Sequence, residues 1–148
     1  MKRIIFVCHG SICRSPAAEF IFKNELKRRG LESEFEVTSL ALSNEEIGND
    51  IYPPMKRELD HVGIPYERHY ARKITMDDYI HADLIFYMDD SNKRIISYLL
   101  NDRDKKIKPI YFYTNDIYEI EDPWYTDNFS KVVSQIKRCV NDILDNIS

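Results

Sequence analysis

Residues 4–16 read IIFVCHGSICRSP. The apolar run Ile4 to Val7 is typical of a buried parallel strand, and Pro16 is favoured at the first position of a helix. A loop between such a strand and helix points backbone N–H groups at one place, where the positive end of the helix dipole adds to their field. This stretch therefore predicts an anion-binding loop beyond the carboxyl end of the first strand.

The rest of the chain alternates between strand patterns and helix patterns. The helix after the loop is predicted to end at Gly30, and the spacing of Thr75 and Asp78 predicts a capping box. Alternation of this kind favours an α/β fold, a single domain over residues 1–148 with three α/β/α layers and a parallel sheet. Further strands are expected at 35–40, 83–88 and 107–112, and further helices at 53–62, from 75, at 91–100 and from 129 to the end.

Composition excludes several classes of function. The chain has 148 residues, 21 Lys and Arg, 25 Asp and Glu, and a net charge of −4, so a basic face for nucleic acid is not expected. The N-terminal apolar run is too short for a signal peptide or a membrane span, which favours a cytoplasmic protein. Three cysteines without metal-ligand spacing argue against a disulfide framework and against a metal site.

The loop holds the groups needed for phosphoryl transfer. Cys8 lies in a field that favours a thiolate, and the planar fork of Arg14 matches two oxygens of a phosphoryl group. The Ser15 hydroxyl can donate to the Cys8 sulfur and stabilise it as a leaving group. The predicted phosphate-binding loop consists of Cys8, His9, Gly10, Ser11, Ile12, Cys13 and Arg14.

A second candidate segment lies before the last helix. Phosphoryl transfer from tyrosine needs a proton donor for the departing phenolate and then a base for water, and Asp122 suits both roles. Pro123 restricts Asp122 to an extended backbone. Trp124 and Tyr125 can flank a substrate ring.

Together these segments resemble the low-molecular-weight protein tyrosine phosphatase family. The likeness rests on residues 7–16 and on Asp122-Pro123, and it extends to Ser39, to residues 46–49, to His69-x-Ala71-Arg72 and to Met88-Asp89. It implies a four-stranded parallel sheet and hydrolysis of phosphotyrosine monoesters through a cysteinyl-phosphate intermediate, without metal or cofactor. The implied substrate is a phosphotyrosine-containing protein or a small phosphate ester.

The resemblance also implies a role for individual residues. Cys8 would be the nucleophile, Arg14 the phosphate clamp, Ser15 the partner of the thiolate and Asp122 the general acid and base. Three further residues would hold the phosphate loop in shape: Ser39, His69 and Asp89. The substrate wall would consist of Ile12, Glu45, Trp124 and Tyr125.

Three positions depart from the family pattern. Ser11 stands where the family usually has Asn, Leu40-Ala41 replaces Ala-Gly, and Glu45 replaces an aromatic side chain of the cavity wall. A carboxylate at Glu45 would give the mouth an acidic rim. Cys13 is a candidate redox partner of Cys8, whereas the spacing of Cys139 on the last helix favours a core position.

Alternatives remain open. A phosphoarginine phosphatase of the same family typically has Thr at the position of Ile12. An arsenate reductase on this fold would need two more cysteines between Tyr79 and Leu100, and that segment has none. A non-enzymatic phosphate-binding module gives no reason for a nucleophile, a clamp and an acid to occur together. The sequence favours a monomer or weak self-association.

Overall fold

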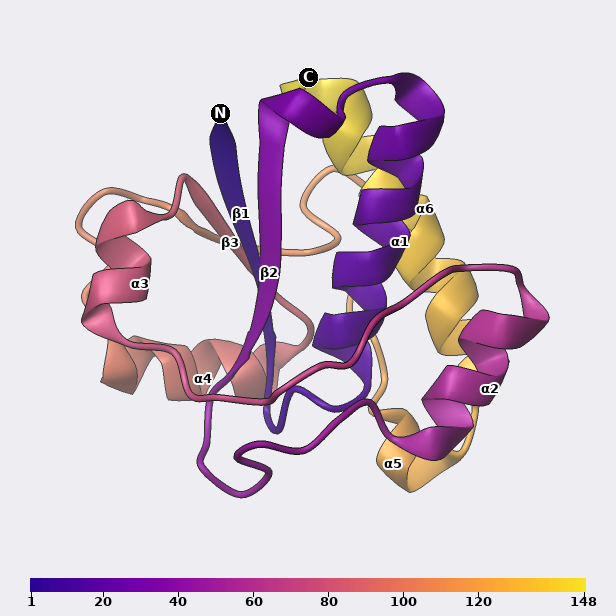
Figure 1. Ribbon diagram of the computed structural model, residues 1–148. Helices are drawn as coiled ribbons and strands as arrows, with labels where there is room; N and C mark the ends of the chain where they lie inside the picture. The colour runs from indigo at the N-terminus through magenta and orange to yellow at the C-terminus, as the bar shows by residue number, and fades with distance from the viewer.

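Four parallel strands form the central sheet of the computed structural model, which describes residues 1–148 (Figure 1). Their order is β2-β1-β3-β4. The strands are β1 Lys2–Cys8, β2 Phe35–Ala41, β3 Leu84–Tyr87 and β4 Ile107–Pro109. The helices are α1 Arg14–Arg29, α2 Pro53–His61, α3 Met76–His81, α4 Asp90–Leu99, α5 Pro123–Thr126 and α6 Phe129–Ile147, with a 3₁₀ helix η1 at Glu32–Glu34.

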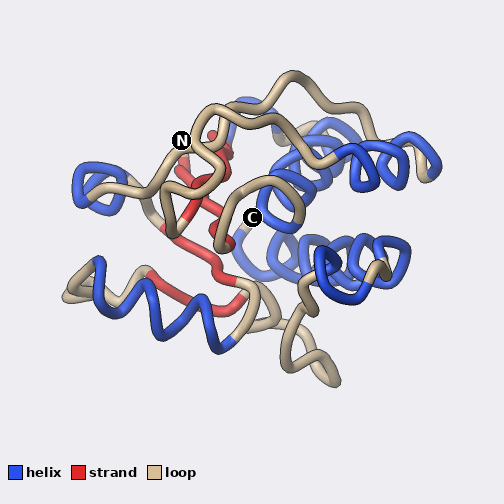
Figure 2. The backbone as a smooth tube through the Cα atoms, turned by 90° about the horizontal axis from the view of Figure 1, so that it is seen from below, coloured by secondary structure: helices blue, strands red, loops and turns tan.

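Helices cover both faces of the sheet. Helices α1, α2 and α6 lie on one side of the strands, and α3 and α4 lie on the other, as the view from below shows (Figure 2). The larger core, of 29 buried residues, lies under α1 and α6, and a second core of 11 lies under α3 and α4. The α/β/α layering expected from the alternating pattern is confirmed. None of the helices is both long and apolar enough to span a membrane.

The apolar stripe of α6 accounts for much of the larger core. Val132, Ile136, Val140 and Ile143 are fully buried, and Cys139 lies among them with no exposed surface. Burial raises the pKa of the Cys139 thiol to about 11, so this side chain stays a neutral, packed group near pH 7. The core position predicted for Cys139 is confirmed.

Strand β1 lies inside the sheet, at the point where the order of the strands reverses. It pairs with β2 on one side and with β3 on the other, so the chain leaves β1 toward one neighbour first and returns beside the other later. In open α/β sheets, ligands bind at such switch points, beyond the carboxyl ends of the strands. The loop that follows Cys8 occupies this place.

Several predicted boundaries need correction. Helix α1 begins at Arg14, so Pro16 is its third residue rather than its first; the first turn of a helix has no N–H acceptors within the helix and tolerates proline there. Strand β4 ends at Pro109 instead of residue 112, because the chain turns at once and Phe112 N–H donates to the carbonyl of Pro109.

One short helix was not predicted. No helix was expected between the fourth strand and the last helix, yet α5 forms there at Pro123–Thr126. Asp122 is its N-cap and accepts a hydrogen bond from Trp124 N–H, while Pro123 occupies the first helical position. Both are common helix-start signals, so the sequence did carry the information.

Candidate active site

The loop after β1 presents free backbone donors. The N–H groups from His9 to Arg14 donate to no acceptor within the chain. The loop leads into the N-terminus of α1, which has no side-chain cap. Unpaired N–H groups at the start of a 16-residue helix form a cradle for an anion, and the helix dipole favours negative charge at the same point.

Cys8 lies at the base of this cradle. Its side chain is buried, and the N–H of Ser15 donates to its sulfur at 3.4 Å. The Ser15 hydroxyl oxygen lies 3.3 Å from the same sulfur. A serine hydroxyl can turn its proton toward a negatively charged sulfur, so the site contains both a candidate nucleophile and a group that stabilises it as a thiolate.

The middle of the loop is held by a buried serine and a histidine. Ser11 has φ 57° and no exposed surface, and its hydroxyl lies 2.9 Å from that of Ser15. His69 Nε2 lies 2.6 Å from the Ser11 carbonyl oxygen and 3.2 Å from its hydroxyl. Because a carbonyl only accepts, Nε2 must carry the proton. Burial lowers the pKa of His69, which favours this neutral form.

One edge of the Arg14 guanidinium is hydrogen-bonded within the protein, and the other edge is free to bind a ligand. Its Nη1 donates to Asp89 Oδ2 at 2.6 Å and to the carbonyl of Ile120 at 2.7 Å, and the side chain is 3% exposed. Asp89 also caps α4 by accepting from Asn92 N–H. The Nε and Nη2 atoms make no hydrogen bond within the chain, and this edge of a guanidinium can bind two phosphoryl oxygens.

Asp122 reaches the same place from the other side of the cleft. Its Oδ2 lies 3.6 Å from Arg14 Nη2, while Oδ1 accepts from Trp124 N–H. The backbone of Asp122 is extended, as expected from the proline that follows it. A carboxyl group so placed can exchange a proton with a group bound above the cradle.

The cleft above the cradle is small, with a volume of about 160 Å³. Trp124 packs on Tyr52, with ring centroids 4.7 Å apart, and the backbone N–H of Tyr52 donates to the carbonyl of Ile12. Apolar and aromatic walls of this kind accept a flat ring. The lining consists of Cys8, His9, Gly10, Ile12, Cys13, Arg14, Glu45, Glu46, Asp122, Trp124 and Tyr125.

A family model for the low molecular weight phosphotyrosine protein phosphatases matches residues 3–148. The chain belongs to this family. The low molecular weight protein-tyrosine-phosphatase YfkJ of Bacillus subtilis is 32% identical over 150 residues, which cover 99% of this chain and 96% of the relative. The low molecular weight phosphotyrosine protein phosphatase of Homo sapiens is 36% identical over 157 residues, which cover 97% and 94%.

The fold agrees with the family. The crystal structure of YfkJ from Bacillus subtilis matches this structure with a TM-score of 0.95 and 31% identity, covering 99% of this chain and 94% of that one. The four-stranded parallel sheet implied by the resemblance is therefore confirmed.

The family resemblance implies that Ser39 holds the phosphate loop in shape, but its hydrogen bond goes elsewhere. Its hydroxyl donates to Glu19 Oε1 at 2.6 Å and makes no hydrogen bond to the phosphate loop. The side chain of Ser39 faces α1 and is buried, and the Glu19 carboxylate is the acceptor within reach. His69 and Asp89, in contrast, both contact loop residues.

Sequence reasoning missed Asp50, which holds the histidine in place. Asp50 Oδ1 accepts from the N–H of His69 and of Ile51, while Oδ2 lies 2.5 Å from Lys56 Nζ and 3.3 Å from Arg68 Nη1. These hydrogen bonds hold the pKa of Asp50 well below its usual range, despite the opposing effect of burial. No spacing rule connects a surface-loop aspartate with a histidine 19 residues away.

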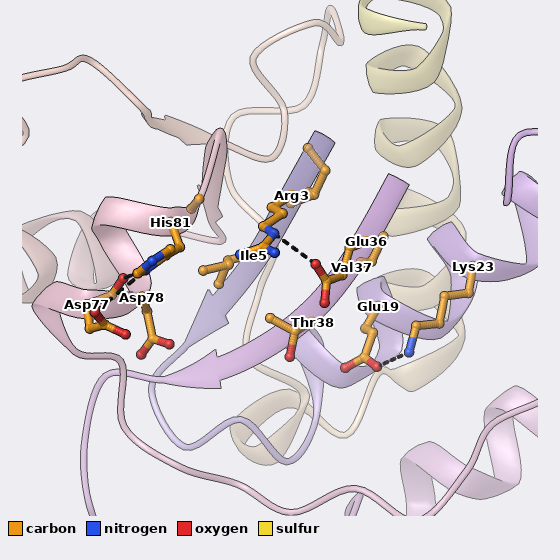
Figure 3. Close-up of a pocket in the computed structure, with 12 residues that line it drawn as sticks. Arg3, Ile5, Glu19, Lys23, Glu36, Val37, Thr38, Asp77, Asp78 and His81 are labelled. Atoms are coloured by element: carbon orange, nitrogen blue, oxygen red, sulfur yellow. Dashed lines mark hydrogen bonds and ion pairs between the residues drawn. The ribbon is translucent and has the colours of Figure 1, made fainter. Parts of the chain in front are cut away.

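A wider hollow lies away from this site. It has a volume of about 530 Å³ and is lined by β1, β2, α1 and α3 (Figure 3). It contains no cysteine, and its basic groups are already paired, so it offers neither a nucleophile nor a free cation for phosphate. The ion pairs are Arg3–Glu36 at 2.9 Å, Lys23–Glu19 at 2.6 Å and His81–Asp77 at 3.6 Å. No group of three or more His, Cys, Asp or Glu side chains is placed to hold a metal ion.

Proposed function

We propose that this protein hydrolyses phosphotyrosine monoesters through a phosphorylated Cys8. The observation that carries this proposal is the convergence of three groups on one cradle. The sulfur of Cys8 lies at its base, the open edge of Arg14 forms one side, and the Asp122 carboxylate lies 3.6 Å from that guanidinium. Family membership supports the same chemistry.

In the first step the Cys8 thiolate attacks phosphorus, an S–P bond forms and the P–O bond to the aryl group breaks. The unpaired N–H groups of the loop and the Nε–Nη2 edge of Arg14 stabilise charge on the equatorial oxygens. Asp122 donates a proton to the departing phenolate, which is a poor leaving group without it.

In the second step water attacks the cysteinyl phosphate. Asp122, now a carboxylate, accepts a proton from this water; the S–P bond breaks, and phosphate leaves. The Ser15 hydroxyl, 3.3 Å from the sulfur, donates to the thiolate as it re-forms. Both steps use the same residues, and the enzyme returns to its starting state.

Phosphotyrosine suits the cleft better than a short phosphate ester of serine. The cradle lies below aromatic and apolar side chains, so a substrate must carry its phosphate on a long, flat group to reach it. Trp124 and Ile12 supply contacts for such a ring. Phosphoarginine is also long, and it is the competing substrate to test.

The test uses three substrates with EDTA present: a phosphotyrosine peptide, a phosphoarginine peptide of the same sequence, and p-nitrophenyl phosphate. We expect kcat/KM to be highest for the phosphotyrosine peptide and turnover to disappear in Cys8→Ser. A higher kcat/KM for phosphoarginine would contradict the substrate assignment. Activity that survives Cys8→Ser would contradict the chemistry.

We also propose that the protein works in a reducing compartment such as the cytoplasm, as a monomer or with weak self-association. All three cysteines are free thiols. A nucleophilic cysteine is inactivated by oxidation, and the neighbouring Cys13 could then protect Cys8 by forming a reversible disulfide. Mass spectrometry after mild peroxide should find a Cys8–Cys13 bond; irreversible sulfonic acid on Cys8 in its place would contradict the protective role.

A further inference from the structure

The rim of the cleft carries two glutamates in different settings. Glu45 is 69% exposed, and its Oε2 lies 2.9 Å from His9 Nε2. Glu46 is partly buried, and its Cγ lies 3.1 Å from the place where a Cβ on Gly10 would be. The carboxylate of Glu46 accepts a hydrogen bond from the Asn49 amide and forms no ion pair.

Because of these settings, the two carboxylates differ in how strongly each acts on a charged group in the cleft. An exposed charge that is paired with a histidine is screened by water and offset when the histidine is protonated. The hydrogen bond to Glu46 comes from a neutral amide, so its negative charge is not compensated. Glu46 lines the same cleft as Cys8 and Arg14, so its field reaches the cradle. Burial is the main reason that the pKa of the Cys13 thiol is raised, and Glu46 adds to the rise.

The other charged groups near the mouth do not neutralise Glu46. Asp122 adds a second carboxylate, 3.6 Å from Arg14, the proposed phosphate clamp on one side of the cradle. Glu121 is neutralised by Lys131 at 2.7 Å. No lysine lines the cleft. The mouth of the cleft is therefore acidic, and the cradle contains the cationic guanidinium of Arg14.

The opposite wall of the cleft also favours a cation. Trp124 and Tyr125 are 52% and 84% exposed, so aromatic surface is accessible at the mouth. Aromatic faces attract ammonium and guanidinium groups. Trp124, Tyr125 and Glu46 all line the cleft that leads to the cradle.

We propose that Glu46 is a specificity-determining residue that favours phosphotyrosine peptides with Lys or Arg next to the phosphotyrosine. This inference rests on the proposed function and names the substrate class of the same site. Glu45, which the sequence singled out, contributes less because its side chain is 69% exposed and its charge is screened by water. The preference comes from charge, so added salt should weaken it.

The experiment compares three peptides that differ only in the residues flanking phosphotyrosine: Lys, Gln or Glu. We expect the wild-type kcat/KM to be about 5-fold higher for the Lys peptide than for the Glu peptide at low salt, as for a rim interaction of modest strength. Glu46→Gln should reduce this ratio to about 2, and Glu46→Lys should reverse it, by the same reasoning. Glu45→Gln, the matched control, should retain most of the wild-type ratio.

Three outcomes would overturn the inference: a wild-type ratio near one, a ratio that is unchanged in Glu46→Gln, or a larger loss in Glu45→Gln than in Glu46→Gln. Each of these leaves the proposed function intact, since the peptides are still hydrolysed. Failure of the wild type to hydrolyse any of the three phosphotyrosine peptides would instead reject the proposed function, and the inference with it.

Discussion

Ser15 contacts Cys8 twice, through its N–H at 3.4 Å and through its hydroxyl at 3.3 Å from the same sulfur. Alanine keeps the backbone contact, so the hydroxyl can be removed alone. Hydrogen bonds to charged groups contribute about 1.5–3 kcal/mol. We therefore expect Ser15→Ala to lower kcat by about 10- to 100-fold, because the thiolate becomes a poorer leaving group.

This loss should appear mainly in the breakdown of the intermediate. Pre-steady-state measurements with p-nitrophenyl phosphate should show a burst of nitrophenol in Ser15→Ala, followed by slow turnover. Ser97→Ala is the control, since the Ser97 hydroxyl donates to a backbone carbonyl on the exposed face of α4. A kcat equal to that of wild type would remove the Ser15 hydroxyl from the mechanism.

Asp122 should matter in proportion to the basicity of the leaving group. We expect Asp122→Asn to slow phosphotyrosine hydrolysis by about 10²–10⁴-fold, the usual effect of losing a general acid. An aryl phosphate whose phenol is strongly acidic needs no proton and should lose less in the first step. A plot of kcat/KM against leaving-group pKa should therefore be steeper in the variant than in the wild type.

The control for this series is Asp127→Asn. Asp127 ends the same short helix in the left-handed conformation, which asparagine tolerates, and it does not line the cleft. Equal slopes for wild type and Asp122→Asn would show that Asp122 is not the proton donor.

Ser11 combines a left-handed backbone with a fully buried hydroxyl. Ser11→Ala removes the hydroxyl contacts to Ser15 and His69 and keeps the carbonyl contact to His69, so we expect a loss of about 1–2 kcal/mol in the free energy of unfolding. Ser11→Val should cost more, because a β-branched side chain is strained at positive φ. Ser11→Asn suits this backbone and should be the mildest change.

Urea unfolding monitored by fluorescence provides the measurement. Lys105→Ala is the matched control, since Lys105 has φ 55° at an exposed position without a buried hydroxyl. If Ser11→Ala and Lys105→Ala lose the same stability, the buried contacts of Ser11 contribute nothing.

Asp50 should make the free energy of unfolding depend on pH. Its folded-state pKa is lowered, so its contribution is present above the unfolded value of about 4 and is lost as the pH falls below that value. We expect Asp50→Asn to be less stable than wild type at pH 7 by about 1–3 kcal/mol, and the difference to shrink below about pH 4.

Unfolding titrations from pH 3 to 7 would measure this difference. Asp116→Asn is the control, because the exposed pair of Asp116 with Arg138 should contribute little. A deficit in Asp50→Asn that stays constant over this range would contradict the account of Asp50.

The sequence predicted the part of the site that is local in the chain. A buried strand, a loop and a helix in succession determine where the N–H groups of residues 9–14 point, so the cradle followed from the order of the elements. The apolar stripe of α6 likewise indicated its buried face, including Cys139. Asp89 came from the family resemblance alone, whereas Asp122 was also a candidate from the proline and the aromatic residues that follow it.

What escaped prediction depends on contacts between distant segments. Arg14 donates to the carbonyl of Ile120, and a backbone acceptor has no sequence signature. Tyr52 supports Trp124 across the cleft, although 72 residues separate them in numbering. Ser39 donates to Glu19 because β2 turns that side chain toward α1. Such pairs depend on how the layers pack.

The most direct test of the central claim is to find the phosphate on Cys8. Wild-type protein is mixed with a phosphotyrosine peptide, denatured within the first turnover and digested with trypsin, and the fragment of residues 4–14 is analysed by mass spectrometry. We expect a phosphate on Cys8 that is retained in Cys13→Ser and absent in Cys8→Ser, together with loss of turnover in Cys8→Ser alone. Phosphate on another residue, or turnover that survives Cys8→Ser, would contradict this claim.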